Sequence, residues 1–363
     1  MVQDNIFIIG NMMSKFSFEI CKTEQVEELV EYIDNNWSKN HILVKSRELL
    51  DWQHKSHCGT YYNFIMVRDN ADESICGVLG FIPTSHFSDS LAQEEEVWLA
   101  IWKVNEGSKY IGLGLGLLNY LKLTFGFKKI CSIGISQIVF PMYQALGYKV
   151  GKLSQFALIN DKLSDYKIIE CNFSLEHSRL NKALHHKMTV INPHEIKKGL
   201  LANDLYASQT KKNSDYFIGR FINHPVYSYE FLGFYHDNEL KMFAVARVVE
   251  HDGRKALRIV DAQGDYTLFR KCSGYLYEYV LENGYEFVDI MQEGIDESVF
   301  LDSGFMKIDK SSSSVVPNYF EPFVKENIEI YYARRDLSEE SFVLFRGDAD
   351  QDRPNILLGE TDE

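Results

Sequence analysis

Residues 98–118 read WLAIWKVNEGSKYIGLGLGLL, and the expected fold of the first half of the chain follows from them. The apolar alternation at the start predicts a strand over 97–104, and the apolar run after the glycines predicts a helix over 116–125. The glycines of 112–116 let backbone N–H groups converge without side-chain obstruction. A helix start adds unpaired donors and partial positive charge, so this turn is a candidate diphosphate site.

Three kinds of phosphate site compete for this turn. A P-loop has Lys followed by Ser or Thr directly after its last glycine, whereas Leu117 and Leu118 stand there. A dinucleotide-binding fold has GxGxxG in its first strand–helix unit, but here the glycines alternate and several predicted strands precede them. A coenzyme A site is the third kind. Lys109 is a candidate cation beside it.

The patterns around the turn predict one mixed α/β unit, followed by a second with the same order of elements. In the first unit, strands are predicted over 16–21, 62–68, 74–83, 97–104, 129–135 and 154–159, with helices over 23–36, 46–54, 116–125 and 138–146. Residues 160–213 are polar and less regular, which predicts a linker and the opening of the second unit. There, strands are predicted over 229–235, 241–251, 256–261 and 286–290, with helices over 267–283 and up to 301.

A short internal repeat supports this duplication. Residues 142–148 read MYQALGY and residues 299–305 read VFLDSGF, so each has an aromatic residue four positions before a glycine that an aromatic residue follows. With the matching order of elements, we expect tandem domains. The expected fold class is α/β in the mixed α+β sense, with a mostly antiparallel sheet flanked by helices in each domain.

Two motifs together resemble those of the GNAT superfamily of acyl-CoA N-acyltransferases. The family's first motif is Arg or Gln, two residues, Gly, one residue, then Gly or Ala, and residues 109–114 follow it with Lys in the first place. The second is Asn, six residues, Tyr, three residues, Gly, then Phe or Tyr, and residues 136–148 follow it with Ser in the first place. The resemblance implies a GNAT domain with the coenzyme A site over 1–165 and a degenerate GNAT-like domain over 166–363 that helps to form the acceptor site.

The resemblance also implies the chemistry and its cofactor, acyl-CoA. An amine attacks the thioester directly, Tyr143 protonates the leaving thiolate, and His86 or Glu96 is the candidate base. Because a thiol has a pKa of about 8.5 and tyrosine one of about 10, this protonation costs only about 2 kcal/mol. A strand that separates from its neighbour holds the pantetheine arm, and one of its amides stabilises the oxyanion. The implied cofactor-binding residues are Ile101, Trp102, Lys103, Val104, Lys109, Gly112, Leu113, Gly114, Leu115, Gly116 and Ser136.

The second half lacks such a glycine turn, and the acidic residues of 259–267 would repel a diphosphate, so we expect one coenzyme A site. The stretches 37–53, 217–225 and 345–355 belong to an overall likeness over most of the chain. By it the chain resembles enzymes that acylate nucleotide-linked amino sugars for bacterial surface polysaccharides. It implies a dTDP-linked amino-deoxy sugar as acceptor and an acetyl or small hydroxyacyl group such as 3-hydroxybutanoyl. Cations and aromatic rings suit such an acceptor, and the candidates are His41, Arg220, His224, Tyr227, Tyr229, Arg247, Arg258 and Arg353.

The amino-acid composition limits the classes of partner and the cellular location that we expect. A net charge of −14 over 363 residues disfavours nucleic acid and anionic membranes. Six scattered cysteines without a CxxC pair predict no metal site and a reducing, cytoplasmic location. No apolar run reaches the length of a membrane span. We expect small-molecule partners and a monomer or homodimer. Two alternatives remain: an aminoacyl transferase of the peptidoglycan type, which would need a basic patch for tRNA, and a non-catalytic acyl-CoA sensor.

Overall fold

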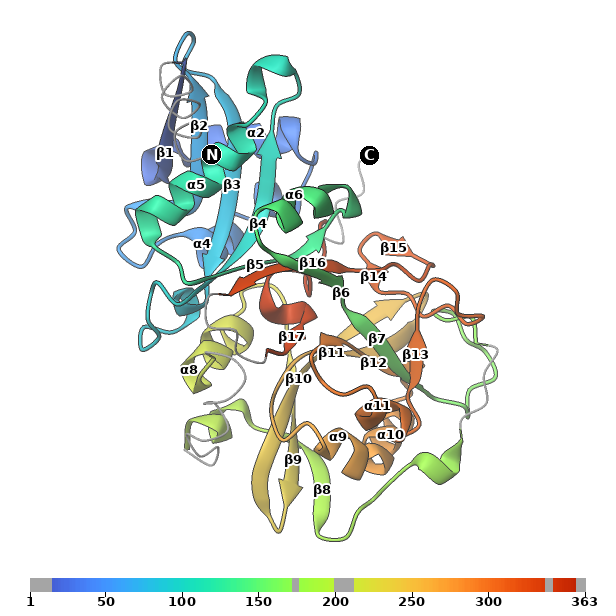
Figure 1. Cartoon of the computed structure of the whole chain (residues 1–363). Helices are drawn as coiled ribbons and strands as arrows, with labels where there is room; N and C mark the ends of the chain where they lie inside the picture. Colours follow the sequence, from blue (N-terminus) through green and yellow to red (C-terminus); the bar gives the residue numbers. More distant parts are fainter. Residues whose placement is uncertain (1–14, 172–175, 199–211, 337–341, 357–363) are drawn as a thin grey trace. The chain divides into compact units, whose positions relative to one another are not determined.

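The computed structural model describes residues 15–171, 176–198, 212–336 and 342–356 (Figure 1). The chain divides into two compact units, with the boundary between Ser132 and Ile133. Each unit contains a β-sheet with helices packed against it. This mixed α/β architecture is the one that the sequence predicts.

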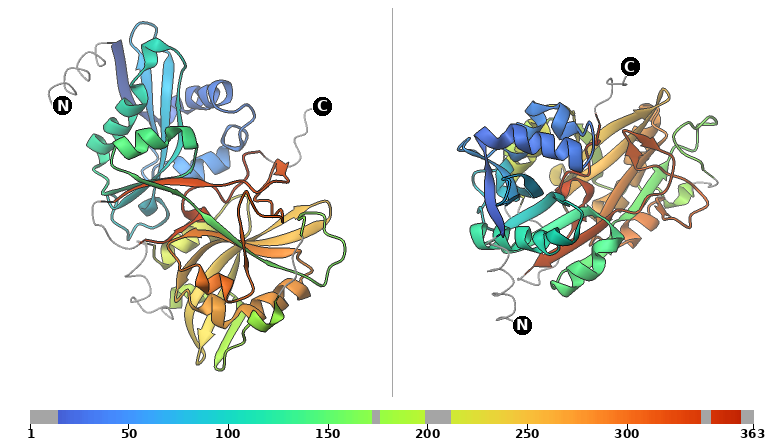
Figure 2. Two further views of the ribbon diagram at one scale, coloured as in Figure 1. Left: turned by 45° about the vertical axis from the view of Figure 1, so that its right-hand side comes forward. Right: turned by 90° about the horizontal axis from the view of Figure 1, so that it is seen from above.

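Unit 1 is built on a mostly antiparallel sheet. Its elements are β1 (Phe16–Lys22), α2 (Val26–Asn36), α3 (Ile42–Lys45), α4 (Arg47–His54), β2 (Tyr61–Asp69), β3 (Ile75–Pro83), β4 (Glu96–Val104), α5 (Leu113–Phe125) and the start of β5 (Lys129–Ile135). The strands lie in the order β1-β2-β3-β4-β5, and only the β4–β5 pair is parallel. Helices α2 and α4 cover one face and α5 the other (Figure 2).

Unit 2 holds the rest of the chain. Its elements are α6 (Phe140–Ala145), β6 (Lys149–Lys152), β7 (Ser154–Ile159), β8 (His186–Ile191), α8 (Ser214–Phe217), β9 (Glu230–His236), β10 (Glu239–His251), β11 (Arg254–Gly264), α9 (Leu268–Lys271), α10 (Ser273–Glu282), β12 (Phe287–Glu293), α11 (Ser298–Leu301), β13 (Met306–Ile308), β14 (Tyr319–Phe320), β15 (Phe323–Val324), β16 (Tyr331–Asp336) and β17 (Leu344–Phe345). One sheet has the order β13-β7-β12-β11-β10-β9-β8. Helices α9 and α10 close its core, where Phe269 and Leu276 are fully buried (Figure 1).

The internal repeat seen in the sequence has the same backbone geometry in both copies. The amide of Tyr148 donates to the carbonyl of Tyr143 at 3.0 Å, and the amide of Phe305 donates to that of Phe300 at 3.2 Å. The glycine inside each turn has a positive φ, +79° in the first copy and +85° in the second. Such bonds close the C-terminal ends of helices, here α6 and α11. The predicted duplication is therefore present at this position.

The two repeats exchange strands within unit 2. By their place after the repeated turn, β6 corresponds to β13 and β7 corresponds to β16. Strand β7 lies between β12 and β13 of the second repeat and is antiparallel to both. Strand β16, near the end of the second repeat, pairs antiparallel with β6 of the first. Each of these pairings joins segments more than a hundred residues apart, and periodicity along the sequence carries no signal for them.

Candidate functional site

The glycine turn forms the N-terminus of α5 and is exposed. Gly112 is the N-cap residue, with φ +89°, a left-handed conformation that favours glycine. No side chain caps the helix, and the first amides of a helix have no acceptor inside it. Ile111 and Leu115 on either side of this turn are 79% and 38% exposed. The turn is thus open to a ligand, and α5 begins at Leu113, earlier than its predicted start at 116.

The next two glycines have different local roles. A Cβ on Gly116 would lie 2.6 Å from the Cζ atom of Phe18 on β1, so glycine is needed there for packing. A Cβ on Gly114 would lie 3.4 Å from the indole Nε1 of Trp102 on β4, which a small shift accommodates. Packing therefore accounts for the glycine at position 116. It does not account for Gly114, which lies in the first turn of α5 beside β4.

A matched pair of substitutions separates these roles. Gly116→Ala is expected to lower the free energy of unfolding by about 1–3 kcal/mol, because the added methyl group overpacks against Phe18. Gly114→Ala is expected to leave it unchanged or slightly raised, since alanine is the better helix former. Urea denaturation of both variants measures the difference. Phe18→Ala in the Gly116→Ala background should restore part of the loss, and equal stabilities of the two alanine variants would contradict the packing role.

Strand β4 has a bulge where its pairing with β5 ends. Its register with β5 runs from Glu96↔Lys129 to Leu99↔Ser132. Opposite β3, Ala100 and Ile101 together face one residue, because the register moves from Phe81↔Leu99 to Leu79↔Trp102. A bulge leaves a backbone group unpaired and bends the strand. In the described part of the chain, β4 beyond Leu99 keeps only its β3 partners, as in the strand separation that the resemblance implies.

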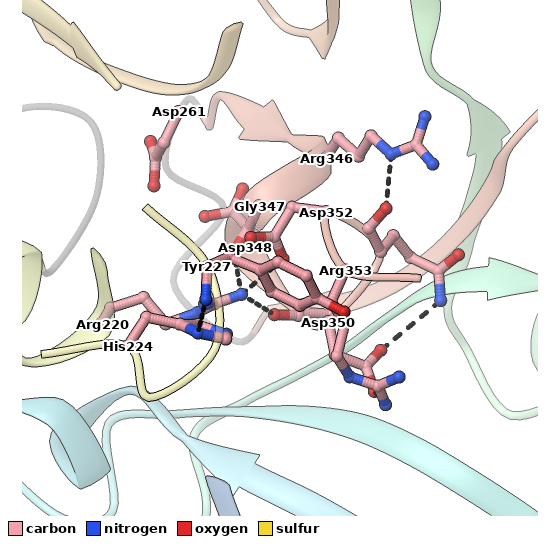
Figure 3. Close-up of polar contacts among 12 residues, drawn as sticks. Arg220, His224, Tyr227, Asp261, Arg346, Gly347, Asp348, Asp350, Asp352 and Arg353 are labelled. Carbon is pink, nitrogen blue, oxygen red and sulfur yellow. Dashed lines mark hydrogen bonds and ion pairs between the residues drawn. The ribbon is translucent and has the colours of Figure 1, made fainter. Parts of the chain in front are cut away.

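The second repeat has the same bulge, but residues of the segment 344–353, called the C-terminal segment below, lie against it. Strand β11 pairs in parallel with β12 up to Ile259↔Ile290, and Val260 is the extra residue opposite β10. Beyond that point β12 pairs with β17. A Cβ on Gly347, just after β17, would lie 2.7 Å from the carbonyl oxygen of Val260. Residues 344–348, of which Figure 3 labels the last three, thus occupy the opening between β11 and β12.

Two polar residues expected near the cofactor have local partners. The Nζ atom of Lys109 lies 3.1 Å from Oδ2 of Asp69 at the end of β2 and 4.7 Å from the ring centre of Tyr110. These contacts raise the pKa of Lys109, the one with Tyr110 most, so it stays cationic while exposed. Ser136 caps the turn before α6, where its Oγ accepts a hydrogen bond from the amide of Ile138 at 3.3 Å.

Tyr143 is buried on α6 and is 2% exposed. Its ring meets that of Tyr148 edge-on, with centroids 5.1 Å apart. The corresponding pair in the second repeat, Phe300 and Phe305, has the same edge-on arrangement at 5.6 Å. The second repeat therefore keeps the packing of Tyr143 without its hydroxyl group.

The candidate bases are both held by hydrogen bonds. His86 Nε2 donates to the carbonyl of Trp52 at 2.8 Å, and Nδ1 faces the side-chain amide of Asn63 at 3.4 Å. Burial lowers the pKa of His86 to about 4, so the ring is neutral near pH 7 and a weak base. Glu96 Oε1 accepts from Thr84 Oγ1 at 2.8 Å and from the indole of Trp98 at 3.2 Å.

Comparison with solved structures identifies the fold. A GCN5-related N-acetyltransferase from Anabaena variabilis matches 88% of this chain and 72% of its own, with 11% identity and a TM-score of 0.53. A probable N-acyltransferase of unknown function from Enterococcus faecalis matches 89% and 73%, with 9% identity and a TM-score of 0.54. The chain has a GNAT fold. No protein-family model matches the sequence, and no curated protein does.

Within this GNAT fold, the two histidines expected to contact the acceptor are buried and bonded to backbone. His41 is the N-cap of α3, where its Nδ1 accepts from the amide of Leu43 at 3.3 Å. His224 Nδ1 accepts from the amides of Val226 and Tyr227 at 3.1 and 3.0 Å. Burial, reinforced by nearby Arg220, lowers the pKa of His224 to about 3. The ring is therefore neutral and shapes the turn before β9.

The arginines expected to contact the acceptor are all buried and paired with carboxylates. The pairs are Arg220–Asp352 at 2.5 Å, Arg247–Glu321 at 3.3 Å, Arg258–Asp289 at 3.0 Å and Arg353–Asp350 at 2.6 Å. Two of these partners, Asp350 and Asp352, belong to the C-terminal segment (Figure 3). Tyr229 joins them by donating to Asp352 Oδ2 at 2.6 Å, and Tyr227 lies under the Arg247 guanidinium at 3.9 Å. The set forms a polar core that includes residues 350–353.

Sequence reasoning missed two buried cations of this core. Lys212 lies between Asp261 on β11 and Asp348 in the C-terminal segment, and all three side chains are at most 1% exposed. Arg346, directly after β17, is 4% exposed. Arg346 begins the acidic run RGDADQDR of residues 346–353.

Among the described residues, no group of three or more His, Cys, Asp or Glu side chains is arranged to hold a metal ion. No helix in the described part is long and apolar enough to cross a membrane.

Proposed function

We propose that this protein is an acyl-CoA-dependent N-acyltransferase whose coenzyme A site lies at the Gly112–Gly114 turn. One observation carries the proposal: an exposed, uncapped helix N-terminus follows a strand that bulges at Ala100–Ile101, where its pairing with the next strand ends. Helix N-terminal amides bind phosphate groups, and unpaired strand amides can hold an amide-containing arm. The GNAT fold supports this assignment.

In the proposed reaction, the acceptor amine attacks the thioester carbonyl, and the C–S bond breaks as the new C–N bond forms. An amide near the bulge, at Ile101 or Trp102, stabilises the oxyanion. Tyr143 gives its proton to the departing thiolate, and the proton lost by the amine passes to Glu96 or to solvent. Lys103, Val104, Leu113, Leu115 and Ser136 remain proposed contacts of the cofactor.

We propose a single coenzyme A site per chain, because residues 344–348 already lie in the equivalent opening of the second repeat. Isothermal titration with coenzyme A is expected to give a stoichiometry near one. Gly114→Ala should weaken binding, since a methyl group crowds the first-turn amides, while stability is kept. A stoichiometry near two would contradict the occupied second opening, and the absence of binding would overturn the proposal.

For the acceptor, we propose a dTDP-linked amino-deoxy sugar, with acetyl or 3-hydroxybutanoyl as the acyl group. Amine-bearing nucleotide sugars, incubated with the protein and several acyl-CoAs, should gain the acyl mass in mass spectrometry. Non-nucleotide amines in parallel reactions test the acceptor class. Binding of coenzyme A without acylation of any amine would favour an acyl-CoA sensor, and transfer that requires aminoacyl-tRNA would favour the peptidoglycan-type alternative.

A further inference from the structure

The buried arginines of unit 2 differ in whether a carboxylate lies within ion-pair distance. Among the described residues, those that are buried are Arg220, Arg247, Arg258, Arg334, Arg346 and Arg353. Five of them contact a carboxylate, including Arg334, which pairs with Asp336. Arg346 has no carboxylate within ion-pair distance in the described part of the chain. A buried guanidinium without a counter-ion is costly, so its surroundings require an account.

The contacts of Arg346 are all uncharged. Its Nε donates to the carbonyl oxygen of Gln351, and its Nη1 lies 3.7 Å from Sδ of Met291, a weak acceptor. Its Cζ lies 5.4 Å from the ring centre of Tyr319. In Figure 3 its guanidinium points away from Arg220 and Asp348. These contacts leave part of the five-donor fork without a strong acceptor.

The charges around Arg346 are mixed, because Arg258 disfavours its cationic form whereas Asp289 and Asp352 favour it without contacting it. Arg258 is the cation that acts on Arg346, and the carboxylate of Asp289 already accepts from Nε of Arg258 at 3.0 Å and from its Nη2 at 3.1 Å. Burial, and then the charge of Arg258, lower the pKa of Arg346 to about 10. An anion bound at Arg346 would relieve both effects.

Asn318, which precedes Tyr319, carries a second polar group whose hydrogen-bonding capacity is not satisfied by the described residues. Its Nδ2 donates to the carbonyl of Ile328 at 2.5 Å, which fixes the orientation of the amide. Its Oδ1 is buried and has no hydrogen-bond partner among the described residues. The backbone carbonyl of Asn318 also accepts a hydrogen bond from Nη1 of Arg258 at 2.8 Å. The orphan acceptor therefore belongs to the residue before Tyr319, whose ring centre lies 5.4 Å from Cζ of Arg346.

We propose that Arg346 binds the oxyanion of a small-molecule ligand, a carboxylate or a phosphate, and that Asn318 Oδ1 accepts a hydrogen bond from the same ligand. Guanidinium groups bind both oxyanions through two parallel hydrogen bonds. That this ligand is the amine acceptor rests on the proposed function, whereas the anion site does not. In a sugar nucleotide the diphosphate would supply the oxyanion, and Arg346 would replace the four paired arginines as its anchor.

The test measures thermal unfolding of the full chain with sodium phosphate or sodium acetate, against sodium chloride at equal ionic strength. For wild type we expect a saturable rise of about 5 °C at one hundred times the Kd of the effective anion. Arg346→Met should lose this rise and unfold at the same temperature as wild type in chloride, or higher, because it removes an uncompensated charge. Arg334→Met, a matched buried arginine with a carboxylate partner, should unfold earlier yet keep the rise.

A phosphate response assigns a phosphorylated ligand, and an acetate response a carboxylate ligand. No rise in wild type, or an equal rise in Arg346→Met, would overturn the site. If Arg346→Met does not fold, Arg346→Lys decides: loss of the planar fork should weaken anion binding about tenfold, and unchanged binding refutes the proposal. No acyl transfer is measured, so failure of the proposed reaction and failure of this site remain distinguishable.

Discussion

Lys212→Met is expected to lower the free energy of unfolding by about 3–5 kcal/mol, because it leaves two buried carboxylates without a cation. The Nζ atom of Lys212 lies 2.7 Å from Asp261 Oδ2 and also contacts Asp348. Asp348 Oδ2 in turn accepts the amide of Phe345 at 2.7 Å, so the same cluster fixes β17. Urea denaturation, with proteolysis of the C-terminal segment as a second readout, measures the loss.

The matched control removes all three charges. Lys212→Met combined with Asp261→Asn and Asp348→Asn should recover most of the loss, because buried neutral groups of similar shape avoid the cost of unpaired charge. If Lys212→Met lowers the free energy of unfolding by less than about 1 kcal/mol, this buried cluster contributes no more than a weak surface ion pair and the prediction is wrong.

The same cluster predicts a dependence of stability on pH. Burial is the main cause that raises the pKa of Asp261 from 3.8 to about 7. Between these two pH values the folded state holds a proton that the unfolded state releases. The resulting contribution to the free energy of unfolding is fully present below about pH 4 and is lost as the pH rises through about 7. Asp261→Asn should remove this dependence, which denaturation at several pH values would reveal.

Tyr143→Phe is expected to lower kcat by about 10²–10⁴-fold while the affinity for coenzyme A stays the same. The hydroxyl is the proposed proton donor to the thiolate, and no other part of the residue changes. Folding should not suffer, because Phe300 occupies the matching position of the second repeat with the same edge-on packing. Steady-state kinetics and isothermal titration with coenzyme A measure the two quantities.

Tyr148→Phe serves as the control, since it removes a hydroxyl from the aromatic partner of Tyr143. It should retain most of the activity. Full activity in Tyr143→Phe would remove the tyrosine from the mechanism and leave protonation of the thiolate to water. Equal losses in both variants would indicate that the aromatic pair matters only for packing.

Local signals in the sequence predicted most elements of the fold. The strands β5 and β7 have the predicted bounds, because each is a short apolar run between turn residues. The start of α5 was placed too late, since glycines lower helix propensity, and the contact between Gly116 and Phe18 depends on tertiary packing. The short strand β6 was missed because four residues show no clear alternation.

The polar core could not be predicted in the same way. Arg258 and Asp289 lie on adjacent strands, and Arg220 meets Asp352 from the far end of the chain, so no spacing along the sequence marks these pairs. An arginine that is neutralised and one that is not look alike in sequence. Arg346 differs from the other buried arginines only in its contacts within the folded structure.

The exchange of β7 and β16 has a consequence for synthesis on the ribosome. Within the described residues, 154–159 pair with strands β12 and β13, and 149–152 pair with 331–334. The first repeat therefore cannot complete its fold while it emerges and must wait until nearly the whole polypeptide is available. Such non-local pairing slows folding and leaves strand edges exposed meanwhile, so chaperone demand during translation should be high, and neither half should be soluble when expressed alone.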